Sequence, residues 1–171
     1  MGHSQVPRII NINEANVRVF RKPGARIHHF DEFPLNEILE FRPEVTVLFL
    51  GGNDINNEEN CVTNVAAGLK RVIEILRNIN SVVIFVEIEW RDFNRSPVPN
   101  LTSETYNQKR KTINRNLKRY CNSRKIRTIN TSSVHLERVG RDLVHFDNLA
   151  AKHVKAKIER ALSHAVGEME A

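Results

Sequence analysis

The chain has 171 residues, a length typical of one folded domain. Its 26 Lys and Arg outnumber its 20 Asp and Glu, which gives a formal net charge of +6 with histidine neutral. The 40% hydrophobic and 27% charged residues are typical of a folded globular protein, and they exclude a wholly disordered or collagen-like chain. The longest apolar runs, 45–50 and 82–86, are far shorter than the roughly 20 residues of a membrane helix. We therefore expect no membrane-spanning segment.

The start of the chain and its cysteines indicate where the protein resides. Residues 1–10 show no basic start followed by an apolar core, so no secretory signal is predicted. Cys61 and Cys121 are far apart and form neither a disulfide framework nor a metal-binding pair. We expect both to be buried, free thiols, and an intracellular, cytoplasmic location is the simplest interpretation.

Strand-like and helix-like segments alternate along the chain. Residues 45–50 form a continuous apolar run of strand length, whereas apolar residues in 58–79 recur at steps of three and four and predict an amphipathic helix. The expected elements, in chain order, are a strand at 17–20, a turn at 22–25, a helix at 34–41, a strand at 45–50, a helix at 58–79, a strand at 82–88, a loop at 91–101, a helix at 103–121, a strand at 126–130 and a helix at 148–165.

This alternation predicts the α/β class, with a parallel sheet covered by helices on both faces. No linker divides the sequence, so we expect one domain over 1–166 followed by a short tail at 167–171. In open α/β sheets, ligands bind beyond the carboxyl ends of the strands. The loops after Phe20, Leu50, Val86 and Asn130 are therefore the places where chemistry is expected.

Several common sites are excluded by their missing motifs. The sequence has no glycine-rich phosphate loop ending in Lys and Ser or Thr, and no dinucleotide-binding fingerprint. It has no H-E-x-x-H pattern and no cysteine pair at metal spacing, which disfavours metal catalysis.

Polar residues at three element boundaries fit a hydrolytic site. Ser4 lies at the amino terminus, Asn53 follows two glycines after the most apolar strand, and Asp142 and His145 precede the last helix. Hydrolysis through an acyl-enzyme needs a nucleophile, a general base, a group that orients the base, and donors to the oxyanion. These four residues have the right types for those roles. Each alone has a structural interpretation: a terminal serine, a turn cap, a loop acid or a buried histidine.

The blocks GHSQV at 2–6, GGND at 51–54 and DLVH at 142–145, with Gly24 between the first two, resemble in order those of the SGNH (GDSL-type) hydrolase superfamily. The resemblance covers nearly the whole chain. It implies a flavodoxin-like three-layer α/β sandwich, an acyl-ester hydrolase of the esterase, lipase or deacetylase class, a small ester substrate and no cofactor.

The resemblance assigns roles residue by residue. Ser4 would be the nucleophile, His145 the general base and Asp142 the group that holds the imidazole. Gly24 and Asn53 would donate to the oxyanion, and Asp54 would fix the loop. The loops 54–60 and 91–103 would select the substrate.

The sequence departs from the family pattern in two ways. His3 stands where the family has an aspartate. The chain also begins too close to Ser4 for the strand that precedes the nucleophile in the family, so we expect a sheet without its first strand.

A basic segment supports a second hypothesis. No acidic residue occurs between Glu104 and Glu137, and the cations there could form a phosphate-binding patch. The candidate residues of this patch are Lys109, Arg110, Arg115, Lys118 and Arg119. The simpler interpretation is a solvated helix face. The alternative function is thus a catalytically impaired SGNH-like module that binds nucleic acid.

Overall fold

The computed structural model describes residues 17–20, 22–32, 35–93, 98–131 and 148–169. Three strands, β1 (Val45–Leu48), β2 (Val82–Val86) and β3 (Arg127–Ile129), form a parallel sheet in the order β1-β2-β3. In its register Val45 lies opposite Val82, and Ile84 lies opposite Arg127. The predicted α/β class with a parallel sheet is confirmed.

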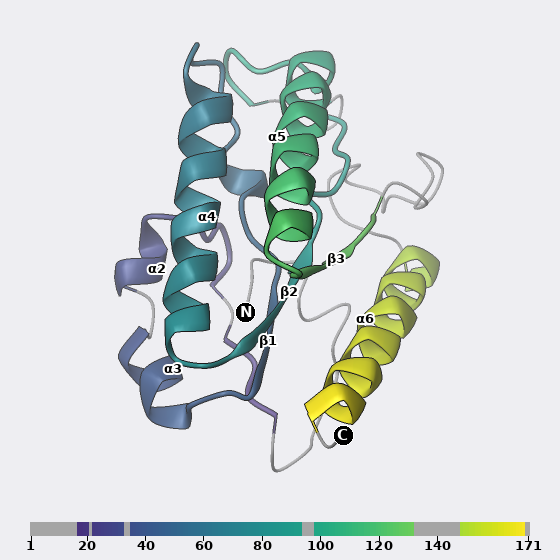
Figure 1. Cartoon of the computed structure of the whole chain (residues 1–171). Helices are drawn as coiled ribbons and strands as arrows, with labels where there is room; N and C mark the ends of the chain where they lie inside the picture. The colour runs from purple at the N-terminus through teal and green to yellow at the C-terminus, as the bar shows by residue number, and fades with distance from the viewer. Residues whose placement is uncertain (1–16, 21, 33–34, 94–97, 132–147, 170–171) are drawn as a thin grey trace.

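The helices follow from how parallel strands must be connected. The helices α4 (Cys61–Asn78) and α5 (Ser103–Ser123) join β1 to β2 and β2 to β3. Because both crossovers step across the sheet in the same direction and such crossovers are right-handed, both helices cover the same face. Figure 1 shows them side by side, with α6 (Asn148–Met169) well apart from both.

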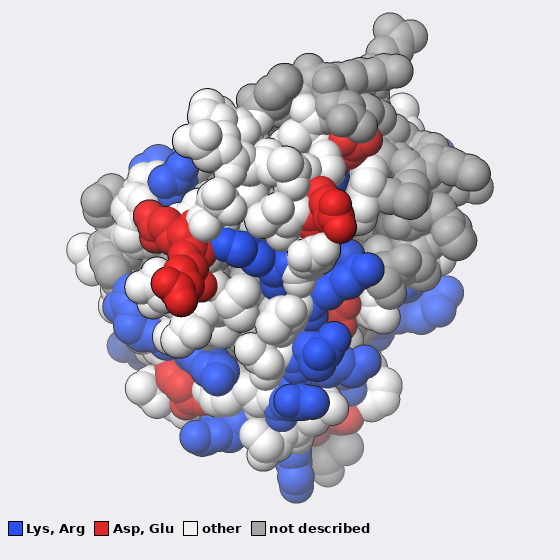
Figure 2. Space-filling model, turned by 90° about the horizontal axis from the view of Figure 1, so that it is seen from above, with Lys and Arg blue, Asp and Glu red and all other residues white. Residues whose placement is uncertain are grey.

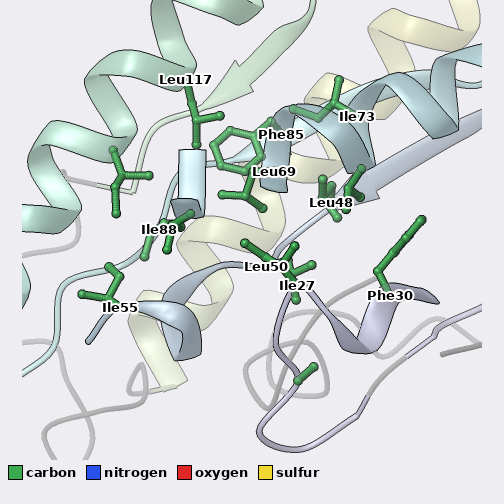
Figure 3. Close-up of a cluster of buried hydrophobic side chains, with 14 of the residues drawn as sticks. Ile27, Phe30, Leu48, Leu50, Ile55, Leu69, Ile73, Phe85, Ile88 and Leu117 are labelled. Carbon is green, nitrogen blue, oxygen red and sulfur yellow. The ribbon is translucent and has the colours of Figure 1, made fainter. Parts of the chain in front are cut away.

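Two apolar clusters make the three layers. The larger packs α4 and α5 against residues of one sheet face, including Leu48 and Phe85 (Figure 3). The smaller packs α6 against Ile84, Val86 and Ile129 on the opposite face. Strand residues alternate between faces, so the continuous apolar run of β2 feeds both clusters at once.

Most predicted elements are found, with shifted ends. The strands end earlier than expected, since β1 stops at Leu48 and β2 at Val86, and α6 continues to Met169, four residues beyond the prediction and into the predicted tail. Two short helices were not predicted: α2 (His29–Glu32) and the 3-10 helix η1 (Gly52–Asp54). The helix α3 (Leu35–Phe41) lies within the predicted range.

The strand predicted at 17–20 is wrong, because this segment has no regular secondary structure. Val17 and Val19 are each 37% exposed, so these two valines are not packed in a sheet core. The expected absence of a strand before Ser4 concerns positions outside the described residues.

Two further findings concern the cysteines and the membrane. Cys61 begins α4 and Cys121 lies near the end of α5, and both are free and buried, as expected. Within the described ranges, no helix is long and apolar enough to cross a membrane.

Candidate functional site

The loop after β1 has a conformation that requires glycine. Gly51 has φ of +104°, a left-handed value that L side chains rarely adopt. A Cβ at this position would also lie 2.9 Å from Cδ1 of Leu69 and 3.1 Å from Cδ1 of Ile88. The chain can therefore turn out of the apolar strand only with glycine here, and it enters η1 directly afterwards.

The turn at 22–25 and the η1 loop are joined by two side chains. Nδ2 of Asn53 donates to the backbone oxygen of Ala25 at 3.0 Å, and Oδ1 of Asp54 accepts from the backbone N–H of Ile27 at 2.9 Å. Gly24 precedes Ala25 in the predicted turn, where its φ is +69°. The Ala25 N–H closes this turn by donating to the Lys22 oxygen. The two expected oxyanion donors, Gly24 and Asn53, thus lie on neighbouring loops, and Asp54 fixes one loop to the other.

A buried ion pair lies beneath Asn53, and the sequence reasoning missed it. Nε and Nη2 of Arg91 donate to Oε1 of Glu89 at 2.9 and 2.6 Å, and the two side chains are 7% and 0% exposed. Nη1 of the same guanidinium donates to Oδ1 of Asn53 at 2.9 Å and to the Gly52 oxygen at 3.3 Å.

Two neighbours shape the surroundings of this guanidinium. A Cβ on Gly52 would lie 2.7 Å from Nη2 of Arg91, so the second glycine gives room to the ion pair. The ring of Tyr106 lies under the guanidinium, with its centroid 5.6 Å from Cζ. Burial lowers the pKa of Arg91, but Tyr106 and Glu89 outweigh burial and raise it, so this side chain remains a cation at every physiological pH.

Three polar residues on one face of α5 hold the segment that carries the ion pair. Asn107, Arg110 and Asn114 are spaced i, i+3 and i+7, so they share one side of the helix, and all three are buried. Asn114 accepts from the Ile88 N–H at 3.0 Å and donates to the Ile88 oxygen at 2.9 Å. This spacing could have been read from the sequence, but polar residues are not expected on an inward helix face.

Asn107 and Arg110 complete this contact. Oδ1 of Asn107 accepts from the Arg91 N–H at 3.4 Å, while its Nδ2 donates to the Arg91 oxygen at 2.7 Å. Arg110 donates from Nη1 to the Ile88 oxygen at 3.2 Å. The backbone at both ends of 88–91 is thus fixed to α5 by side chains.

The predicted basic patch is divided by the structure. Arg110 is buried in the contact just described, so it does not belong to an exposed patch. Lys109 donates from Nζ to the backbone oxygens of Asn56 and Glu58 at 3.0 and 2.6 Å, which holds the loop that follows η1. Arg115, Lys118 and Arg119 are exposed. Figure 2 shows Lys and Arg side chains across the lower half of one face, with acidic side chains among them.

The other three expected site residues are the nucleophile, the general base and the group that orients the base. Ser4, Asp142 and His145 lie outside the described residues. What the structure describes is the oxyanion side of the expected site: Gly24, Asn53 and the buried residues behind them. In the described part of the chain, no group of three or more His, Cys, Asp or Glu side chains is arranged to hold a metal ion.

Comparison with known proteins defines the family. Residues 4–153 match the GDSL-like Lipase/Acylhydrolase family, so the chain belongs to this family. No match was found among curated proteins. Membership of this family supports a hydrolase.

Solved structures agree with this assignment. A GDSL-like lipase from Bacteroides thetaiotaomicron has a TM-score of 0.74 at 16% identity, with 96% of this chain and 86% of that chain covered. A lipase/acylhydrolase from Enterococcus faecalis has a TM-score of 0.62 at 18% identity, with coverages of 83% and 72%. The acetyl xylan esterase AlAXEase has a TM-score of 0.59 at 18% identity, with coverages of 82% and 78%. At these identities, the likeness shows the shared fold.

Proposed function

We propose that this protein hydrolyses small acyl esters through an acyl-enzyme formed on Ser4. The observation that carries the proposal is the fixed position of Asn53 beside the Gly24 turn, in a chain that belongs to the GDSL-like family. The Asn53 amide has two N–H donors, and one of them is used by the Ala25 oxygen. The second is the donor that we assign to the oxyanion.

The reaction follows from these roles. Oγ of Ser4 attacks the ester carbonyl carbon, and its proton passes to His145, which Asp142 orients. The negative charge that forms on the carbonyl oxygen is stabilised by the backbone N–H groups of Ser4 and Gly24 and by Asn53. The alcohol leaves with the proton from His145. Water then attacks the acyl-enzyme with His145 again as base, which releases the acid and restores Ser4.

The test is labelling of the purified protein with a fluorophosphonate probe, together with hydrolysis of 4-nitrophenyl acetate. Ser4→Ala and His145→Ala should abolish both signals. Asn53→Ala should lower kcat by about 10²–10³-fold, the usual effect of losing one oxyanion donor. Ser163→Ala, an exposed serine on α6, is the matched control and should leave both signals unchanged. A wild-type protein that is folded by circular dichroism but neither labelled nor active would overturn the proposal.

The exposed side of α5 favours a second candidate, binding of nucleic acid. Arg115, Lys118 and Arg119 are exposed on consecutive turns of this helix. Binding through them should weaken as salt rises, because each phosphate contact releases counterions. Reversing these three charges to Glu should abolish binding of a fluorescent oligonucleotide, measured by anisotropy. Equal binding by the wild type and the reversed variant would reject this candidate.

A further inference from the structure

The side-chain amide of Asn53 can face the site in two ways, with opposite consequences. With Nδ2 toward the substrate, it donates to an oxyanion, whereas with Oδ1 there it would repel the same charge. The two orientations have nearly the same shape, so packing alone does not choose between them. Something that distinguishes an oxygen from an N–H group must set the orientation.

Arg91 makes that distinction. A guanidinium has donors only, and its Nη1 lies 2.9 Å from Oδ1 of Asn53. On the other side, the Ala25 oxygen is an acceptor only, and it lies 3.0 Å from Nδ2. A flipped amide would set two donors against each other at Arg91 and two acceptors against each other at Ala25. One orientation thus makes both hydrogen bonds, and the other makes neither.

The guanidinium is itself held rigidly. Glu89 binds it through Nε and Nη2, and the Gly52 oxygen accepts from Nη1. Asn107 fixes the Arg91 backbone to α5 on both its N–H and its oxygen. The side chain is almost wholly buried, so water cannot replace it as the partner of Asn53.

We propose that Arg91 is a positioning residue for the oxyanion site: it holds the Asn53 amide with Nδ2 toward the substrate oxygen. Its positive charge at Oδ1 also polarises the amide, which strengthens the Nδ2 donor. Arg91 acts only through Asn53 and does not touch the substrate. This inference rests on the proposed function.

A double-mutant cycle between Arg91 and Asn53 tests the proposal. Arg91→Met should lower kcat for 4-nitrophenyl acetate by about 10–10²-fold, with KM changed by less than about threefold, because the lost donor acts in the transition state. In an Asn53→Ala background, the same substitution should lower kcat by less than about threefold, because its target is gone. A fall by the same factor in both backgrounds would overturn the positioning role.

Two further variants separate positioning from folding. The double variant Arg91→Met, Glu89→Gln removes the ion pair without leaving a buried carboxylate charge beside an apolar side chain. This double variant should lose as much activity as Arg91→Met alone. The control is Arg77→Met, which breaks another Arg–Glu pair at the end of α4, where Nη1 of Arg77 lies 3.0 Å from Oε1 of Glu74. This variant should leave kcat unchanged. An active double variant would overturn the proposal.

A readout without catalysis separates this inference from the proposed function. The side-chain NH₂ signals of Asn53 can be assigned by their loss in Asn53→Ala and followed by ¹⁵N–¹H NMR. In Arg91→Met they should shift and broaden as the amide loses its fixed orientation. Unchanged Asn53 signals would overturn the positioning role whatever the activity. Absence of labelling and hydrolysis in the wild type would overturn the proposed function instead.

Discussion

The strand β2 and the segment that continues it, residues 87–91, are held in different ways. Within β2, the backbone pairs with β1 on one side and β3 on the other, and its side chains fill the two apolar clusters. Just beyond Val86, the Glu87 N–H still donates to the Ile129 oxygen, as in a ladder. Side chains of α5 and Thr131 then take over the backbone groups.

The two regions differ in how strongly they depend on the identity of particular side chains. Backbone groups in the interior need partners whether or not a neighbouring strand is present. In β2 any apolar residue of suitable volume preserves those partners, because they are backbone atoms. In 87–91 the partners are particular amide and guanidinium atoms, so the same continuous stretch of chain becomes sensitive to side-chain identity where it reaches Asn53.

The largest effect is expected in the body of the strand. Phe85 is fully buried between the sheet and α4 and α5, and Phe85→Ala should lower the free energy of unfolding by about 3–5 kcal/mol. Urea unfolding followed by circular dichroism measures this loss. Val82→Ala, on the same strand but 38% exposed, should cost far less. Equal losses of unfolding free energy in the two variants would show that burial of Phe85 in the core does not stabilise the fold.

A smaller loss is expected where side chains replace the ladder. Asn114→Ala removes both bonds to Ile88 and should lower the free energy of unfolding by about 1–3 kcal/mol, the usual cost of buried groups left without a partner. Asn116→Ala, on the same helix but less buried, is the matched control. If the two substitutions have the same effect in urea, the hydrogen bonds to Ile88 do not stabilise the segment.

The smallest effect concerns Glu87 and depends on pH. Burial raises the pKa of Glu87 although Lys118, Arg110 and Lys157 oppose the shift. The native protein therefore holds this proton more tightly than the unfolded chain, and the carboxylate form is destabilising once pH exceeds the ordinary glutamate pKa. Glu87→Gln should raise the melting temperature at pH 7, and the gain should vanish at pH low enough to protonate both states. A gain that grows as pH falls would contradict this sign.

Periodicity predicts the layers of this protein well, but it does not select the candidate site residues. The apolar run in 45–48 predicts a buried strand, and the apolar stripe of α4 predicts an amphipathic helix. Each pattern can bury its apolar side chains in only one type of secondary structure. The short apolar segment 17–20 failed as a strand signal, because Val17 and Val19 remain partly exposed instead of packing on a sheet face. Asn53 and Gly24 were located through the motif order.

The buried polar residues behind Asn53 were missed for a different reason. A charged residue is assigned to the surface by default, since isolated burial of a charge is costly. Arg91 and Arg110 are buried because Glu89 and Asn107 neutralise or bind them, and pairing of this kind depends on which elements meet in space. The alternation of Glu87, Glu89 and Arg91 after an apolar strand was the available signal.

The two cysteines provide chemical reporters for the two ends of this molecule. Sγ of Cys61 accepts from the Asn56 N–H at 3.3 Å, next to the loop held by Lys109, whereas Cys121 is wholly buried under the far end of α5. Burial raises the pKa of Cys121 to about 11, so at neutral pH it is an unreactive thiol until the fold opens. The alkylation rate of Cys61 therefore reports how often the loop beside the site opens, and that of Cys121 how often the helix layer separates.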